Sequence, residues 1–269
     1  MISGRKLDIA ERWLRDGIDA CRVPAFFASV DADMSQARAL IRTARSHDRR
    51  ITYTHVIVRA AALALAANPD LNRMVCGGFV HSPGQVDIAL SVAGESFAAP
   101  LLVIQGADSK EIGSLAGEII RRAPEVRDAD REMMRALRRW GWLLPMGGVR
   151  RIVLRALFRS FNFRRRGAGT FQVSVVPGVD RAMSPVFSAS AMLVAGSVKD
   201  RVVAVEGRTM VRPTVTLTAC ADHRVWDGYA GQRFLLSVQE ILESSVLFEE
   251  FSRTVEVNRD FAAAAAGAG

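Results

Sequence analysis

The stretch ADHRVWDGYAG, residues 221–231, carries the side chains best suited to acid–base chemistry. The chain has four histidines, and His223 stands between Asp222 and Asp227, with Gly228 directly after them. A free imidazole titrates close to neutral pH, so it can take a proton from an attacking thiol, hydroxyl or amine. We consider His223 as a general base, with two alternatives: a metal ligand, or a histidine that only packs at the end of a strand.

The predicted strand TVTLTACADH determines which way the His223 side chain points, because successive side chains of a strand point to opposite faces. One face holds Val215, Leu217, Ala219, Ala221 and His223, and the other holds Thr216, Thr218, Cys220 and Asp222. Cys220 and His223 therefore point apart, which argues against a cysteine–histidine nucleophilic pair. No second ligand follows at helical or hairpin spacing, so no metal site is predicted. A rigid position between a strand and a helix favours the general base.

The elements that must hold this site alternate irregularly along the chain. Apolar periodicity predicts helices over residues 5–15, 34–46, 54–69, from 109 onward, and 228–244. Strands are predicted over residues 24–33, 85–94, 99–106, 169–176, 190–198, 201–207 and 214–222. Thr54 and Ser109 are the predicted N-caps of their helices, and Ile120 belongs to the apolar face of the second. Together these elements predict one layered α/β or α+β domain.

The composition and the terminal segments of the sequence predict where the protein is located and the state of its cysteines. The chain has 269 residues, 49% of them hydrophobic, and no run of eighteen apolar residues. Its charged first residues, MISGRKLDIAERWLRDG, do not form a signal peptide, so a cytoplasmic location is expected. The cysteines Cys21, Cys76 and Cys220 show no metal-binding or disulfide spacing and are predicted to be free buried thiols. The tail at residues 262–269, AAAAAGAG, is expected to be disordered.

Basic charge is concentrated in one segment. Residues 121–166 hold fourteen arginines and four acidic residues, which gives a local charge of +10. Because the net charge of the whole chain is +8, all the other residues together carry −2. Arg151, Arg155 and Arg159 follow at four-residue spacing and predict one stripe on a helix. Three interpretations are open: a solvated helical excursion, a dock for an acidic carrier protein or coenzyme A phosphates, or an anionic membrane surface. Nucleic acid is not predicted, because no known basic–aromatic module is present.

Several stretches together resemble one known family. ADHRVWDG resembles the DHRxxDG motif in the catalytic domain of dihydrolipoyl acyltransferases, the core subunits of 2-oxoacid dehydrogenase complexes. It is also similar to the HHxxxDG motif of chloramphenicol acetyltransferase and of peptide-synthetase condensation domains. Further matching stretches include GRKLDIAERWL, SVDADMSQARAL, ITYTHVIVRAAALALAANPDLN and GTFQVSVVPG. The resemblance covers about residues 4–122 and 167–245, in order.

The resemblance implies the chloramphenicol acetyltransferase-like fold, a large mixed β-sheet flanked by helices. One acyltransferase catalytic domain would span residues 1–261, with a basic helical insertion at about 123–166 that has no counterpart in the family. Homotrimers with active sites at the subunit interfaces are implied as well. The acyl carrier is expected to be a separate molecule, since the chain shows no lipoyl domain.

Site residues are implied at four positions. His223 takes the place of the general base, with its other ring nitrogen bonded to backbone. Ser174, in FQVSVVPG, takes the place of the serine that donates to the oxyanion of the tetrahedral intermediate. Asp227 would form a structural ion pair with Arg5 and so hold the histidine loop. The valine that follows Ser174 departs from the family's Ser-Asn or Ser-Ser pair, which affects acceptor recognition.

The implied function is a freestanding acyltransferase that moves an acyl group from a coenzyme A or carrier-protein thioester to a thiol, hydroxyl or amine. No permanently bound cofactor is expected. The main alternative is a non-catalytic core protein that assembles with dehydrogenase subunits. A condensation-type enzyme is a further alternative, but such enzymes usually need a tandem pair of these folds.

Overall fold

The computed structural model describes residues 7–20, 23–94, 98–143, 146–186 and 188–267. The helices are α1 (Ile9–Ala20), α2 (Ser35–Ser46), α3 (Tyr53–Ala67), α4 (Ile112–Trp140), α5 (Gly147–Phe158), α6 (Phe161–Ala168), α7 (Gly228–Glu243) and α8 (Val246–Gly267). The strands are β1 (Ala25–Asp33), β2 (Met74–Cys76), β3 (Phe79–His81), β4 (Ile88–Ser91), β5 (Leu101–Ile104), β6 (Phe171–Val175), β7 (Ala191–Ala195), β8 (Lys199–Val205) and β9 (Arg208–Asp222). Short 3₁₀ turns are η1 (Pro69–Leu71), η2 (Ala107–Ser109) and η3 (Gly141–Leu143).

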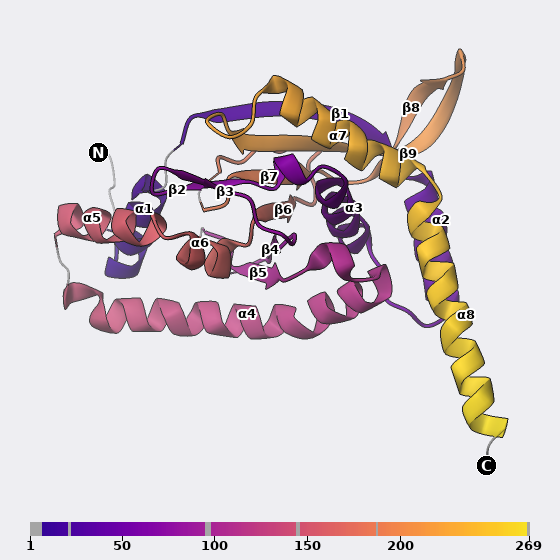
Figure 1. Ribbon diagram of the computed structural model, residues 1–269, viewed down its shortest axis with the longest axis horizontal. Coiled ribbons are helices and arrows are strands. Elements are labelled where there is room, and N and C mark those ends of the chain that lie inside the picture. Colours follow the sequence, from indigo (N-terminus) through magenta and orange to yellow (C-terminus); the bar gives the residue numbers. More distant parts are fainter. Residues whose placement is uncertain (1–6, 21–22, 95–97, 144–145, 187, 268–269) are drawn as a thin grey trace, which may run out of the picture.

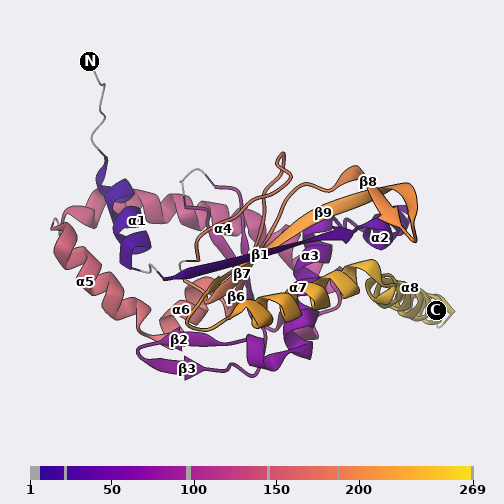
Figure 2. The ribbon, with the colours of Figure 1, turned by 90° about the horizontal axis from the view of Figure 1, so that it is seen from above.

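The main sheet is mixed and has the order β1-β9-β7-β6-β4-β5, with β8 pairing the far half of β9. Strand β6 runs parallel to β4 and β7, and the other pairs are antiparallel. Helices α7 and α3 pack on one another, and α7 lies along β1 (Figure 1). Seen from above, α7 lies beside β1 (Figure 2), while α4 packs against α3 and the edge strand β5. The expected large mixed sheet flanked by helices is confirmed.

The predicted alternation of β9 is confirmed. Val215, Leu217, Ala219 and Ala221 lie in the main hydrophobic core, while Cys220 lies in a smaller cluster on the other face. Cys76 and Cys220 are buried and not in disulfides, and Cys21 falls outside the described residues. Strand β9 therefore forms the centre of the domain and ends at the residue before His223.

Both predicted N-caps are wrong. Thr52 rather than Thr54 caps α3, because the backbone N–H of Thr52 donates to Nδ1 of His55 at 3.2 Å and forms half of a capping box. Glu111 occupies the N-cap position of α4, while Ser109 lies in η2 and donates its hydroxyl to the Gly106 carbonyl at 2.8 Å. Local hydrogen bonds determine where α3 and α4 begin, and the spacing of apolar residues in the sequence does not reveal these hydrogen bonds.

Other predictions fail at the periphery. Ile120 is 40% exposed, since only Ile112, Leu115, Ala116 and Ile119 of that apolar series reach the core. The short strands β2 and β3 and helix α8 were not predicted. Helix α8 continues to Gly267, whereas residues 262–269 were expected to be disordered; an alanine run has the highest helix propensity of any sequence.

The basic segment is helical, as expected, and consists of the end of α4 followed by α5 and α6. Helix α4 continues through Pro124 to Trp140, and α5 and α6 then lead back to β6. Figure 1 shows α4 running the length of the domain, with α5 and α1 at one end and α8 and the β8–β9 hairpin at the other. The buried pair of Arg150 and Asp16, at 2.6 Å, joins α5 to α1. The insertion is thus attached to the N-terminal helix.

Candidate functional site

His223 stands at the end of β9 with its ring exposed. Its backbone N–H donates to the Pro24 carbonyl at 2.8 Å, which extends the pairing with β1. Its ring Nδ1 lies 3.0 Å from the Trp226 carbonyl oxygen. A carbonyl oxygen only accepts hydrogen bonds, so this contact places the proton on Nδ1 and leaves the Nε2 lone pair free. The imidazole has the tautomer that a general base requires, with a backbone partner of the expected kind.

Trp226 fixes the turn that carries this carbonyl. Its indole is 1% exposed, and Nε1–H donates to the Leu71 carbonyl at 3.0 Å. The ring packs against Phe234 and Phe171 with centroid separations of 5.2 and 6.1 Å. A buried aromatic ring with its one donor satisfied restricts the backbone on both sides of it. The role of Trp226 was not predicted from the sequence, although a tryptophan within a short polar turn was the available signal.

Charged residues close the same turn. The buried Asp222 carboxylate accepts from the backbone N–H of Arg224 at 3.0 Å and from its guanidinium at 2.9 and 2.7 Å. These hydrogen bonds raise the pKa of Arg224. Asp227 caps α7 by accepting from the Ala230 N–H at 2.8 Å. Arg5, the predicted partner of Asp227, lies outside the described residues, so that ion pair stays a prediction.

Ser174 lines a pocket of about 480 Å³ on the face of the sheet opposite the main core. It lies on β6 and is half-buried. Most of the wall is apolar, with a few hydroxyl and amide groups. The lining comprises Leu14, Gly17, Ile18, Ser91, Ala98, Ala99, Leu101, Phe158, Gln172, Ser174, Ser184, Pro185, Ser188 and Met192. An apolar pocket with few polar groups is typical of small-molecule sites.

Within one chain, Ser174 and His223 are far apart. Ser174 is in register with Val194 of β7, and Val194 with Thr218 of β9. His223 comes five residues after Thr218, which is roughly 16 Å along the strand. Two strand spacings add roughly 10 Å sideways. The two side chains predicted to act on one carbonyl therefore do not meet in a single copy.

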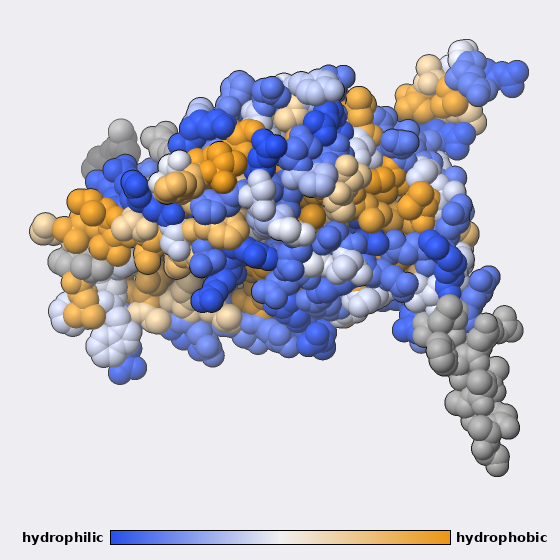
Figure 3. Space-filling view, in the orientation of Figure 1, coloured by the Kyte–Doolittle hydropathy of each residue, from blue (hydrophilic) through white to orange (hydrophobic). Residues whose placement is uncertain are grey.

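The predicted arginine stripe lies on α5, with Arg159 at the C-cap of the helix. Arg151 and Arg155 line one open pocket together, and the Arg151 Nη1 lies 3.7 Å from Asp16 and 3.9 Å from Asp19 of α1. Arg155 and Arg159 also line a pocket on the far side of Phe158. Exposed apolar residues lie beside them, namely Trp140, Trp142, Leu143, Met146, Ile152, Val153 and Leu157. Figure 3 shows hydrophobic residues gathered at this end of the molecule.

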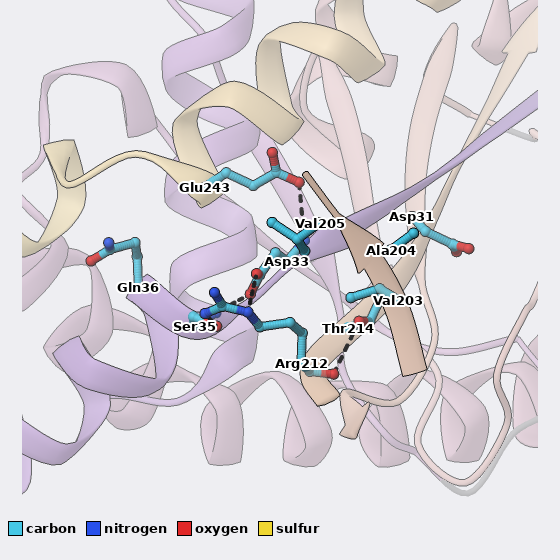
Figure 4. Close-up of a pocket in the computed structure, with 10 residues that line it drawn as sticks. All are labelled: Asp31, Asp33, Ser35, Gln36, Val203, Ala204, Val205, Arg212, Thr214 and Glu243. Carbon is cyan, nitrogen blue, oxygen red and sulfur yellow. Dashed lines mark hydrogen bonds and ion pairs between the residues drawn. The ribbon is translucent and has the colours of Figure 1, made fainter. Parts of the chain in front are cut away.

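Another pocket, of about 490 Å³, lies at the opposite end of β1 and β9 from His223 (Figure 4). Arg212 lies 3.8 Å from the Asp33 carboxylate, and Glu243 accepts from the Asp33 backbone N–H at 3.0 Å. The Ser35 N–H donates to Asp33 at 2.7 Å. The Nε of Arg212 is buried and makes no hydrogen bond, but the pocket lacks both Ser174 and His223, so we do not place the proposed site there.

The part of the chain that the structure describes contains neither a cluster of metal ligands nor a membrane-spanning helix. No group of three or more histidine, cysteine, aspartate or glutamate side chains there could hold a metal ion. None of the helices in that part is long and apolar enough to cross a bilayer.

Comparison with known proteins places the chain near one family. Residues 18–133 and 168–248 match the family described as 2-oxoacid dehydrogenases acyltransferase (catalytic domain). The chain is 28% identical over 244 residues to the lipoamide acyltransferase component of the Bacillus subtilis branched-chain alpha-keto acid dehydrogenase complex, covering 89% of this chain and 48% of that protein. It is 24% identical to the dihydrolipoyllysine-residue succinyltransferase of Rickettsia bellii, covering 88% and 52%. The chain thus spans about half the length of these curated relatives.

Solved structures show the same fold. A probable dihydrolipoamide acetyltransferase from Listeria monocytogenes superposes with a TM-score of 0.71 at 19% identity, covering 91% of this chain and 95% of that one. The Azotobacter vinelandii dihydrolipoamide acetyltransferase, studied for the roles of a serine, a histidine and an asparagine in its mechanism, superposes at 0.68 and 17% identity, covering 91% and 92%. The family match leaves out residues 134–167, which hold the end of α4, all of α5 and nearly all of α6.

Proposed function

Since the chain belongs to the 2-oxoacid dehydrogenase acyltransferase family, we propose that it transfers an acyl group from a thioester donor to a thiol, hydroxyl or amine. Its curated relatives are named for acyl transfer involving a lipoamide or dihydrolipoyllysine residue. A dihydrolipoyl thiol is the acceptor nearest to those names. Coenzyme A or carrier-protein thioesters serve as donors, and both are substrates rather than bound cofactors.

One observation carries the proposal: the Nδ1–H of His223 is held by the Trp226 carbonyl, and Nε2 is left free on an exposed ring. In the proposed step, Nε2 takes the proton of the acceptor thiol while its sulfur attacks the thioester carbonyl carbon. The carbonyl oxygen becomes an oxyanion, to which the Ser174 hydroxyl donates a hydrogen bond. Collapse of this intermediate breaks the carbon–sulfur bond of the donor, and the imidazolium returns its proton to the departing thiolate.

The separation of the two residues within one chain requires a second copy. We place Ser174 of one subunit opposite His223 of its neighbour in a homotrimer. Two features support this arrangement. The distance along the sheet is too long for direct cooperation in one chain, and the His223 ring is exposed in an isolated subunit. Cyclic symmetry would repeat the same contact at each of the three interfaces.

The test is thiol release from a panel of acyl-coenzyme A donors, with dihydrolipoamide as acceptor. His223→Ala is expected to lose about 10²- to 10⁴-fold in kcat, because a general base contributes that much. His47→Ala is the matched control, since His47 is exposed and lies beyond the end of α2. If wild-type protein cleaves no thioester, the non-catalytic core becomes the better hypothesis. If His223→Ala equals His47→Ala, another group is the base.

A further inference from the structure

A second pocket, of about 360 Å³, lies next to the Ser174 pocket and shares Phe158 with it. Its walls come from Ala20 of α1, the β2–β3 turn, the ends of α5 and α6, and Arg224 in the His223 turn. The pocket therefore adjoins the Ser174 pocket on one side and, on another, the turn that carries His223 of the same chain. The proposed reaction gives it no role.

Four arginines line this pocket and no acidic residue does: Arg155, Arg159, Arg164 and Arg224. Arg224 is neutralised by Asp222 at 2.7 Å. Within the described residues, the other three form no ion pair with a carboxylate. The pocket thus carries a local positive charge of three that the chain itself does not balance.

Arg164 gives the clearest sign that an anion belongs here. Its residue is 9% exposed, and its guanidinium donates to the carbonyls of Ser188 at 2.6 Å, Val75 at 2.5 Å and Ala189 at 3.2 Å. These partners satisfy its hydrogen bonds but bring no negative charge. Removing an ionised group from water without a counter-charge is unfavourable. A bound anion would supply the missing charge.

The pocket is already formed in the free protein. Arg159 lies at the end of α5, and Ser160 caps α6 by accepting from the Phe163 N–H at 3.4 Å. Opposite them, the β2–β3 turn has Gly77 at φ +60° and Gly78 at φ +90°. A Cβ on Gly77 would lie 3.2 Å from the Arg159 carbonyl oxygen, so the turn packs closely against this junction. Little reorganisation is needed before binding, which favours affinity.

We propose that this pocket binds a phosphate group of the acyl donor, while the arm of the donor passes Phe158 toward Ser174. Arginine forks suit phosphate oxygens, which accept paired charge-assisted hydrogen bonds. Arg155, Arg159 and Arg164 all fall in the stretch that the family match leaves out, so the site is a property of this chain. The phosphate site stands on its own, and only the path to Ser174 rests on the proposed function.

Calorimetric titration of the purified protein tests the site directly, with inorganic pyrophosphate, adenosine 3′,5′-bisphosphate and 4′-phosphopantetheine as probes. Arg155→Gln with Arg159→Gln is expected to raise the Kd of the bound probe by about tenfold or more, because two charge-assisted contacts are lost. The control is Arg135→Gln with Arg139→Gln, which removes the same charge at the same spacing from exposed positions of α4. That control should change the Kd by about twofold or less.

The same titrations distinguish two possible donors, free coenzyme A and a phosphopantetheine arm bound to a carrier protein. Binding of the bisphosphate indicates free coenzyme A, and binding of 4′-phosphopantetheine alone indicates a carrier-bound arm; either supports the site. Equal losses in the two double variants, or no loss in the first, would overturn it. Because this readout needs no turnover, His223→Ala protein must still bind the probe. Failure of acyl transfer is thereby distinguished from failure of the phosphate site.

Discussion

At the residue scale, the proposed role of His223 as a general base depends on which nitrogen of its ring carries the proton. The Trp226 carbonyl settles this, and Trp226 is in turn held through its indole by Leu71. The motif in the sequence indicated the histidine, and the family resemblance implied that its partner is a backbone group. They could not indicate that the partner is Trp226, because that depends on how the turn is anchored in the core.

Trp226→Phe should lower kcat by about tenfold and leave the donor KM nearly unchanged. The variant keeps an aromatic ring but loses the donor to Leu71, so the accepting carbonyl and the imidazole become less well placed. Initial rates over a range of donor concentrations measure this. Phe234→Leu, which alters the same aromatic cluster without a lost hydrogen bond, is the comparison. A fall of equal size in both would show that core packing alone is responsible.

Ser174→Ala should lower kcat by roughly 10²-fold with little change in donor KM, since a donor to the oxyanion acts mainly in the transition state. Ser184→Ala is the control, because Ser184 lines the same pocket and its hydroxyl already donates to the Pro185 carbonyl at 3.3 Å. A change in KM alone would instead assign Ser174 to substrate binding.

At the scale of single elements, His55 couples the start of α3 to pH. Burial, helped by the nearby Arg50, lowers the pKa of His55 to about 4 from its usual 6.5. The unfolded chain therefore binds a proton near pH 6.5 that the folded chain does not bind until about pH 4. Stability is fully present above pH 6.5 and falls as the pH drops through this window.

His55→Gln should flatten that dependence, since an amide can still accept from the Thr52 N–H but does not titrate. Urea unfolding at pH 7 and at pH 4.5 measures the effect. The wild type should lose on the order of 2–3 kcal/mol more than the variant between these values. His47→Gln, at the exposed end of α2, should leave the wild-type loss in place.

One buried ion pair joins α8 to α3, beside the core contacts of Leu247 and Phe251. Glu250 accepts from Arg59 at 2.9 Å and from the first N–H of α4, at Ile112, at 2.5 Å. Glu250→Gln should cost about 3 kcal/mol in urea unfolding, because it leaves the Arg59 guanidinium buried without its counter-charge. Asp200→Asn breaks the more exposed contact with Arg38 and should cost about 1 kcal/mol or less. Similar costs for the two would mean that Glu250 acts only as a helix cap.

Sequence patterns predicted elements well where one face is buried. The alternation in β9 and the apolar face of α4 were legible because they reflect burial in the core. Strands β2 and β3, of three residues each, are too short to show a period. Helical spacing grouped Arg151 with Arg155, which line one pocket, but it could not show that Asp16 and Asp19 of α1 lie beside Arg151. Contacts between elements far apart in sequence decided these cases.

At the scale of the whole molecule, the proposed trimer makes a prediction about mixtures. Co-expressed His223→Ala and Ser174→Ala chains, each nearly inactive alone, should assemble into mixed trimers that regain activity. A site needs an intact His223 from one chain and an intact Ser174 from its neighbour. With equal amounts of both chains, random assembly gives a half times a half, or about a quarter of wild-type activity.

Differently tagged chains allow the mixed trimers to be purified and assayed as one species. Two lots of His223→Ala chains with different tags are the control and should stay inactive. Mixed trimers with no more activity than their parents would mean that each chain builds its site alone, contrary to the register of the sheet.

The pairing of β1 with β9 also bears on how the chain is made. Residues 25–33 are synthesised nearly two hundred residues before their partner strand, residues 214–222. The centre of the sheet must therefore wait until β9 has left the ribosome, and meanwhile the edges of β1 and β7 that pair with β9 have no partner. Distant pairings of this kind slow folding and expose aggregation-prone surface during translation. A ribosome that stalls before residue 214 would release a chain without its central strand, a natural substrate for chaperones and proteases.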